Sequence, residues 1–284
     1  MKLSKIFALL LALCLISSAA CAATFTDAHG NVIELDDSLE AYAAVTLVGA
    51  DNAARQGETN LGDLWADALR WFAVSGEINA AFDEDDVKAG NDRIAVDADH
   101  VVALWNGGNL RADIAEGTFG AEALAEVLPF PNKVAVVYMT GAQLLETLEA
   151  ASQGLPYTAE TADACASLMQ VSGLTYTVDT TKAYDALEAY GDHWFTAGSV
   201  SRVRIDDVNG QPFDAEATYA VVTSNANFNG MDSSYVLKSA AEANEQSAVT
   251  TAVVRDVVFR FIAAELNHQV GEAYAAPQGR LTIL

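Results

Sequence analysis

The chain has 284 residues, 51% of them hydrophobic, and a formal net charge of −24 at neutral pH. A charge this negative excludes a nucleic-acid-binding surface, because such surfaces are basic, and an anionic ligand would have to be held by a local cluster of the few arginines. The length and the apolar content are sufficient for one large domain or two small ones, each with a buried core.

Residues 1–23 have the pattern of a secretory signal peptide. Lys2 and Lys5 precede an apolar run over 6–16, and small residues occupy most of 17–23. The run is too short to cross a bilayer, which takes about 20 residues, so we expect no transmembrane span in the mature form. We expect an exported protein that is periplasmic, on the cell surface or extracellular. The processing site stays open among cleavage after Ala20, Ala22 or Ala23 and a lipid anchor at Cys21.

Residues 24–45 are expected to form an N-terminal lead-in segment. Within it, 27–31 predicts a polar turn and 32–35 predicts a strand. Cys14 is lost with the signal peptide, which leaves Cys21 as the one partner that Cys165 has within the chain. The mature chain therefore has at most one disulfide and depends on its core for stability.

The next segment predicts a helix with Asn60 as its N-cap, because apolar residues repeat there at 3.6-residue spacing. The residues of this stripe are Leu61, Leu64, Trp65, Ala68, Leu69 and Phe72. The acidic, turn-rich stretch 83–99 is expected to be a solvated loop. Segments rich in Val, Ile, Thr and Tyr then predict strands at 101–105 and 133–140.

A second helix is expected directly after the strand at 133–140, because Thr140 and Gln143 have the spacing of a capping box. A second solvated loop, 154–167, is expected before strands at 173–179, 199–205 and 219–224. Ser247 is expected to cap the third and longest helix, whose apolar stripe is Val253, Val254, Val257, Val258, Phe261, Ile262 and Leu266. This irregular alternation predicts an α/β fold with mixed sheets covered by helices.

Six short motifs follow one another along the chain. They are RQGETNLGDLWADA at 55–68, NGGNLRADI at 106–114, EVLPFPN at 126–132, MTGAQLL at 139–145, LMQVSGL at 168–174 and QGRLT at 278–282. In sequence and order these motifs resemble the C-terminal, substrate-binding domain of 5′-nucleotidases. The resemblance covers residues 46–284 and implies that domain's layered α/β/β/α architecture.

The resemblance also implies a substrate site. Its residues would be Arg55, Asn106, Gly107, Gly108, Arg111, Phe130, Asn132, Phe228 and Asp232. Arg55 and Arg111 match the family's phosphate-binding arginines, and guanidinium groups hold phosphate through paired, charge-assisted hydrogen bonds. The glycines follow a predicted strand and would let the backbone approach a ligand closely. Phe130 and Asn132 match the positions that stack and hydrogen-bond a nucleobase.

The stretch SNANFNGMDSSY at 224–235 departs from the family's pattern N-D-F-x-x-x-G-G-D-G-Y. Counted without gaps, Ala226 stands at the second stacking position. The second aromatic of the clamp is therefore expected to be missing, unless Phe228 reaches in from two residues away. Met231 and Ser233 replace glycines, and Pro131 also replaces a glycine, where proline fixes φ and removes an N–H.

Catalysis in the family resides in a separate N-terminal metallophosphoesterase domain that holds two metal ions. Residues 24–54 are too few for such a domain. Residues 27–30 have the sequence DAHG, which matches the D-x-H-G motif at the start of that catalytic domain. The other loops that a dinuclear metal site needs do not follow it in order. We expect no catalytic residue, metal ligand or cofactor in this chain, and a divalent metal only with a separate catalytic partner. The sequence also lacks a nucleophile elbow, a P-loop, a GxGxxG motif and a CxxC motif.

Three hypotheses follow. The first is an exported nucleotide- or nucleoside-binding domain that is related to 5′-nucleotidase and is not catalytic alone. In the second, the chain is the substrate-binding half of a two-chain 5′-nucleotidase that a separate metallophosphoesterase chain completes. In the third, ligand binding is lost and the domain serves as an extracellular structural or interaction module.

Overall fold

The computed structural model of the chain describes residues 23–26, 32–35 and 40–284. The positions of the predicted cleavage and lipidation sites up to Ala22, and the predicted polar turn at 27–31, lie outside these residues. The strand predicted at 32–35 is confirmed as β2 (Val32–Leu35), which pairs antiparallel with β1 (Ala23–Thr26).

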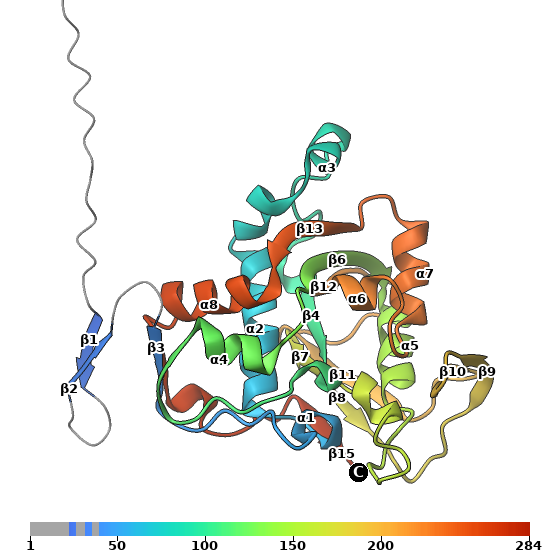
Figure 1. The fold of residues 1–284 in the computed structure, drawn as a ribbon. Coiled ribbons are helices and arrows are strands. Elements are labelled where there is room, and N and C mark those ends of the chain that lie inside the picture. The colour runs from blue at the N-terminus through green and yellow to red at the C-terminus, as the bar shows by residue number, and fades with distance from the viewer. Residues whose placement is uncertain (1–22, 27–31, 36–39) are drawn as a thin grey trace, which may run out of the picture.

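A five-stranded mixed sheet of order β13-β6-β12-β4-β7 forms the centre of the molecule (Figure 1). Strand β12 pairs parallel with β4 and antiparallel with β6. The sheet is covered on both faces, so its strands read as continuous apolar runs and not as alternating ones. Their bounds are β4 (Val101–Asn106), β6 (Lys133–Thr140), β7 (Met169–Ser172), β12 (Thr218–Ser224) and β13 (Ala248–Val253).

One face of this sheet packs against helices α2 (Asn60–Val74), α4 (Ala121–Val127) and α8 (Val254–Ala264). At the middle of this layer Trp65 of α2 meets Trp105 of β4, with ring centroids 6.1 Å apart. All six residues of the predicted apolar stripe on α2 are fully buried. Burying that stripe against the sheet is what fixes the position of α2.

The other face packs against helices α5 (Gly141–Ala151) and α7 (Tyr235–Ala243) and against a second, smaller sheet. This sheet has the order β11-β8-β15, with bounds β8 (Leu174–Val178), β11 (Val203–Val208) and β15 (Leu281–Ile283). Tyr176 of β8 is fully buried, and its hydroxyl donates to Met169 O of the central sheet at 2.6 Å. The predicted α/β fold of mixed sheets covered by helices is confirmed.

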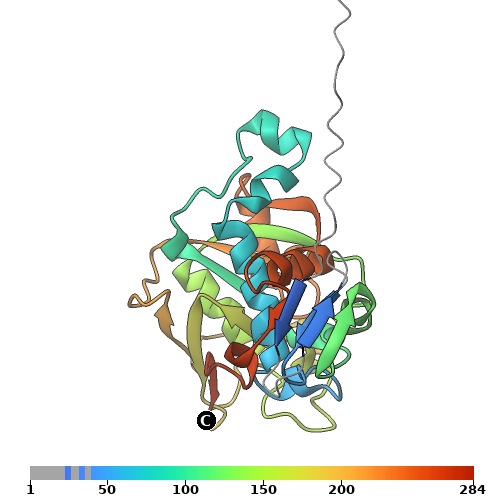
Figure 2. The same cartoon turned by 90° about the vertical axis from the view of Figure 1, so that its left-hand side faces the viewer.

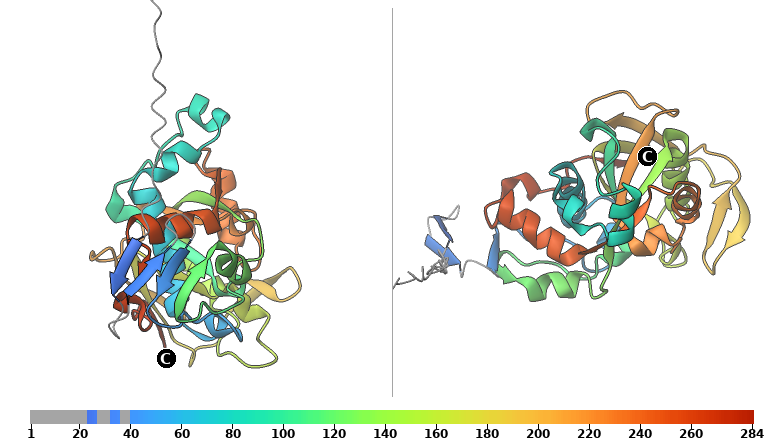
Figure 3. Two further views of the ribbon diagram at one scale, coloured as in Figure 1. Left: turned by 60° about the vertical axis from the view of Figure 1, so that its left-hand side comes forward. Right: turned by 90° about the horizontal axis from the view of Figure 1, so that it is seen from above.

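Shorter elements surround these layers. Figure 2 faces the side formed by α8 and by a third sheet, β14-β3-β5, and Figure 3 shows the β9–β10 hairpin protruding at the opposite end. Among the helices of the described residues, none is long and apolar enough to cross a lipid bilayer. The bounds are β3 (Glu40–Ala43), β5 (Gly117–Gly120), β9 (Ala186–Tyr190), β10 (Trp194–Ala197), β14 (Gln269–Val270), α1 (Ala53–Gln56), α3 (Glu84–Ala89), α6 (Asn225–Phe228), η1 (Glu77–Ala81), η2 (Ala98–His100), η3 (Gly107–Asn109), η4 (Ala164–Ser167) and η5 (Glu272–Tyr274).

The N-cap predicted for α2 is wrong by one residue. Thr59 is the cap, and its Oγ1 accepts a hydrogen bond from Gly62 N at 3.0 Å. Asn60 instead uses its side chain to bridge distant segments, because its Oδ1 accepts from Val48 N and its Nδ2 donates to Tyr274 O. The capping box predicted for α5 is confirmed, with Thr140 and Gln143 bonded reciprocally.

The prediction for the third helix is also wrong. Ser247 precedes a strand and not a helix, since 248–253 form β13 and pair with β6. Helix α8 has 11 residues and is therefore shorter than α2, which has 15. The β-branched residues at 249–251 favour the strand at the sheet edge. Two further predictions differ from the structure. The stretch 83–99 is predicted as a loop but contains α3, whose N-cap is Asp83. The strand predicted to start at 199 starts instead at Val203.

A buried group of charged side chains ties α2 to the last strand of the chain. Arg280 lies 2.8 Å from Asp67 Oδ2 and 3.8 Å from Asp63 Oδ1, and Leu281 N donates to Glu58 Oε2. Burial raises the pKa of Asp63 from its ordinary value of 3.8 to about 8, against the opposing charge of Arg280 and with a further contribution from Glu58. Glu58 Oε1 and Asp63 Oδ1 are otherwise unpartnered among the described residues, so a proton on Asp63 that is shared with Glu58 satisfies both.

This pKa makes stability depend on pH. The folded protein holds the Asp63 proton more tightly than the unfolded chain, so the free energy of unfolding should fall as pH rises from about 4 through about 8. Asp63→Asn stays uncharged and should remove much of this fall. The check is thermal unfolding at about pH 6 and about pH 8.5. The exposed control Asp97→Asn should keep the wild-type dependence, and an Asp63→Asn variant that also keeps it would contradict the assignment.

Candidate functional site

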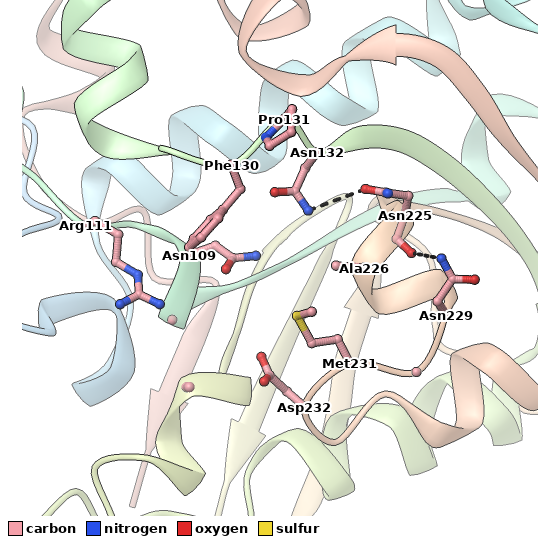
Figure 4. A pocket seen from close by; sticks show the side chains of 13 residues that line it. Asn109, Arg111, Phe130, Pro131, Asn132, Asn225, Ala226, Asn229, Met231 and Asp232 are labelled. Carbon is pink, nitrogen blue, oxygen red and sulfur yellow. Dashed lines mark hydrogen bonds between the residues drawn. The ribbon is translucent and has the colours of Figure 1, made fainter. Parts of the chain in front are cut away.

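A cavity of about 640 Å³ opens at one edge of the central sheet (Figure 4). Strands β4 and β12 are parallel and both end at this edge, and the antiparallel β6 begins there. The segments that enter or leave these strands therefore meet around the cavity, as is usual for ligand sites in α/β sheets. The lining residues are Gly108, Asn109, Arg111, Phe130, Pro131, Asn132, Ala166, Asn225, Ala226, Asn229, Gly230, Met231 and Asp232.

The structure brings five residues of the predicted substrate site into the wall of this cavity: Gly108, Arg111, Phe130, Asn132 and Asp232. The other four, Arg55, Asn106, Gly107 and Phe228, do not line it. Phe228 packs instead against the core that contains α5 and α7. It does not reach in beside Ala226, so the wall at that point carries a methyl group where the family has an aromatic ring.

Arg111 forms the positive end of the cavity, and Arg55 lies near enough to influence its pKa. The guanidinium of Arg111 lies 5.8 Å from the centre of the Phe130 ring, and the backbone N–H of Arg111 donates to Val127 O. Burial and the nearby charge of Arg55 lower the pKa of Arg111, and Asp232 opposes this shift. Arg55 is largely buried and donates to Ala162 O at 2.9 Å. Arg111 is exposed and lines the cavity, so its planar guanidinium is accessible to an anion there.

Asp232 brings a carboxylate to the same wall. Its φ is +55°, and its Oδ2 accepts from Asn106 Nδ2 at 2.9 Å, while Asn106 Oδ1 accepts from Asn109 Nδ2 at 2.8 Å. Burial raises the pKa of Asp232, against the opposing effects of Arg55, Asn106 and Arg111. Asn106 therefore acts from behind the wall by orienting Asp232.

Gly107 and Gly108 allow neighbouring segments of the chain to pack closely. A Cβ added to Gly107 would lie 2.0 Å from Ala54 O of α1, and one added to Gly108 would lie 2.7 Å from Ala166 Cβ of η4. Such distances exclude any larger residue without movement of the backbone. For Gly107 the structure thus shows close packing against protein, whereas Gly108 also borders the cavity.

The residues at the other end of the cavity are aromatic or carry amides. Phe130 is 43% exposed, so its ring is available to a ligand, and Asn132 is buried behind it. Asn132 Nδ2 lies 3.4 Å from Asn225 Oδ1, and Lys133 N donates to the same oxygen at 3.0 Å. Asn132 Oδ1 is without a hydrogen-bond partner in the described part of the chain. This end therefore offers a stacking surface with unused hydrogen-bonding capacity beside it.

Sequence reasoning missed Gln170, which holds α1 in place. Its Oε1 accepts from Thr59 N at 3.0 Å, and its Nε2 donates to Ala54 O and Gly57 O at 3.1 and 2.9 Å. Gln170 lies within the LMQVSGL motif, and that motif was the available signal. Its side chain fixes the short helix that carries Arg55.

The stretch 154–167, predicted as a solvated loop, also contributes to the site. Ala166 lines the cavity, and Asp163 lies 3.7 Å from Arg55 Nη1. Asp113, in the second motif, accepts hydrogen bonds from the backbone N–H groups of Gly49 and Ala50 and so fixes the segment that leads into α1. Across the described residues there is no group of three or more His, Cys, Asp or Glu side chains placed to hold a metal ion.

Comparison with known proteins gives a consistent result. A sequence model of the 5′-nucleotidase C-terminal domain matches residues 40–239. The trifunctional nucleotide phosphoesterase protein YfkN of Bacillus subtilis (strain 168) is 28% identical over 188 residues, which are 65% of this chain and 10% of that protein.

Solved structures agree with this match. The 5′-nucleotidase precursor of Thermus thermophilus has a TM-score of 0.60 at 29% identity, over 86% of this chain and 39% of that one. The NAD nucleotidase NadN of Haemophilus influenzae has the same fold, with a TM-score of 0.57 at 15% identity, over 86% of this chain and 38% of that one. The chain thus spans about two fifths of each solved relative.

Replacement of Gln170 tests the support of α1. Gln170→Ala removes three hydrogen bonds and leaves backbone groups of Ala54, Gly57 and Thr59 unpaired, so it should lower the free energy of unfolding by about 2–3 kcal/mol. Urea denaturation measures this loss. The exposed control Gln246→Ala should change stability by less than about 0.5 kcal/mol. Equal effects of the two substitutions would show that Gln170 does not support the helix.

Proposed function

The chain belongs to the 5′-nucleotidase C-terminal domain family, and on that premise we propose that it is an exported protein that binds a nucleotide or nucleoside and does not hydrolyse phosphate esters by itself. One observation carries the proposal. Arg111 and Phe130 line the same cavity, with the guanidinium 5.8 Å from the centre of the ring. A cation and an exposed aromatic face at this spacing suit a ligand that joins an anionic group to a planar ring.

In the proposed complex the phosphate lies at the arginine end. Arg111 borders the cavity directly, and Arg55 adds positive charge from α1, which Gln170 holds in place. The net charge of −24 repels anions at long range, so the local pair must supply the attraction. The hydrogen bonds of a guanidinium to phosphate are charge-assisted and are strong enough for this.

The base lies against Phe130, with the Asn132 amide beside it. Between the two ends, Asp232 is suited to accept hydrogen bonds from sugar hydroxyls, since a carboxylate is an acceptor and Asn106 holds it in position. Wall residues Asn109, Asn225 and Asn229 add further amide groups around the ligand. The cavity volume of about 640 Å³ lies within the usual range of small-molecule sites.

The second candidate function is the substrate-binding half of a two-chain 5′-nucleotidase, in which a separate metallophosphoesterase chain would break the phosphate ester bond. The match to the C-terminal domain of the family motivates it. Mixing this protein with a metallophosphoesterase chain and a divalent metal, with AMP as substrate, would support it by a gain in phosphate release.

Export rests on the sequence of residues 1–23, where two lysines precede a short apolar run and small residues. The compartment in which the protein meets its ligand would then be the periplasm, the cell surface or the medium. A nucleotide bound there would be one that lies outside the cytoplasm.

The proposal predicts ligand-dependent stabilisation that requires Arg111. A nucleotide at 100 times its dissociation constant should raise the free energy of unfolding by about 2.7 kcal/mol, which is measurable as a thermal shift. Arg111→Ala should weaken AMP binding by about tenfold to a hundredfold, because a hydrogen-bonded charge is lost. The same variant should affect adenosine less.

The matched control is Arg93→Ala, since Arg93 is exposed and pairs with its neighbour Asp92. It should bind AMP as the wild type does. The screen includes nucleosides, nucleotides and inorganic phosphate. No shift with any of them would favour a non-binding structural or interaction module, and AMP turnover by the purified protein with Mn²⁺, Zn²⁺ or Co²⁺ that Arg111→Ala abolishes would contradict the absence of catalysis.

A further inference from the structure

The wall opposite Phe130 contains an unusually exposed methionine. Met231 is 54% exposed and Phe130 is 43% exposed, and both line the cavity. They come from different segments, since Phe130 precedes β6 and Met231 lies in the loop between α6 and α7. In Figure 4 the Met231 side chain extends from that loop toward the space below Phe130. Exposed apolar surface inside a cavity is available to an apolar ligand group.

The backbone holds Met231 beside Ala226. Met231 N donates to Ala226 O at 3.0 Å. The residues on either side, Gly230 and Asp232, have φ angles of +86° and +55°, so the chain turns sharply at this point. Gly230 O accepts from the Tyr190 hydroxyl of the β9–β10 hairpin at 2.7 Å, which fixes the loop from outside. The thioether therefore lies next to the position where an aromatic ring is missing.

A planar base has two faces, and both must be covered if the ring is to leave water. Phe130 covers one face, while the methyl group of Ala226 is too small to cover the other. We infer that Met231 forms the second wall of the base site, an inference that rests on the proposed function. A methionine has three rotatable bonds and a polarisable sulfur that packs well on aromatic rings, so it adapts to rings of different size. The site therefore accepts purine and pyrimidine bases alike.

Calorimetric titration tests this assignment with adenosine, cytidine and uridine. Met231→Ala should weaken the binding of each by about tenfold, whereas Met231→Leu should stay within about threefold of the wild type, because it restores the apolar bulk. The control Val87→Ala removes an equally exposed apolar side chain on α3 and should change nothing. Unliganded melting temperatures of the variants should match the wild type, since Met231 is not part of the core.

Methyl NMR gives a direct readout of stacking. The chain has four methionines, and apart from Met1 they are Met139, Met169 and Met231. Met139 and Met169 are buried in the core, with 3% and 1% exposure. In protein labelled at the methionine methyl carbons, adenosine should move the Met231 signal upfield, because the methyl group lies over the ring. The two core signals should stay in place, and Met231→Leu assigns the moving peak.

Two outcomes would overturn the inference in different ways. If adenosine binds, Phe130→Ala loses it, and Met231→Ala binds as the wild type does with an unmoved methyl signal, then Met231 is not the second wall and the proposed function stands. If the wild type binds no nucleoside or nucleotide, the inference and the proposed function fail together.

Discussion

The parallel pairing of β4 with β12 is the constraint on which the candidate site depends. Because both strands end at the same edge of the central sheet, η3 after β4 and α6 after β12 face each other across the cavity, and the antiparallel β6 starts at that edge on the other side of β12. The pairing brings Asn106 and Asp232, 126 residues apart, within 2.9 Å. Two layers of helices and a second sheet cover the faces of the sheet, so that its edge is left for the ligand.

The site is locally positive, whereas the whole chain has a negative net charge. The chain carries 39 acidic and 15 basic residues, yet Arg55 and Arg111 are close enough to influence one another. Such a pair is stable only if the backbone holds it, because like charges repel. Gln170 fixes α1 beneath Arg55, and the close approach of Gly107 to Ala54 leaves α1 no room to move. The groups that hold α1 in place are thus uncharged, and the carboxylates near the two arginines are Asp163, 3.7 Å from Arg55, and Asp232.

Much of the fold could be predicted from the sequence, and the exceptions have physical reasons. Strand β6 matches its prediction residue by residue, because a buried β-branched run and a capping box both mark its end. At Ser247 the sequence is compatible with a helix cap and with a strand start, and pairing with β6 decides for the strand. The motifs located Arg111, Phe130 and Asp232. They did not identify Gln170 or Ala166 as supports, since these act through contacts with residues more than 50 positions away that exist only in the folded chain.

The proposed function requires that one cavity hold a phosphate at Arg111 and a base at Phe130. The decisive measurement is a crystal structure of the protein grown with saturating AMP. Its electron density should show the phosphate within hydrogen-bonding distance of the Arg111 guanidinium, the adenine stacked on Phe130, and Met231 against the other face of the adenine. AMP bound elsewhere on the protein, or an empty cavity at saturating AMP, would contradict it.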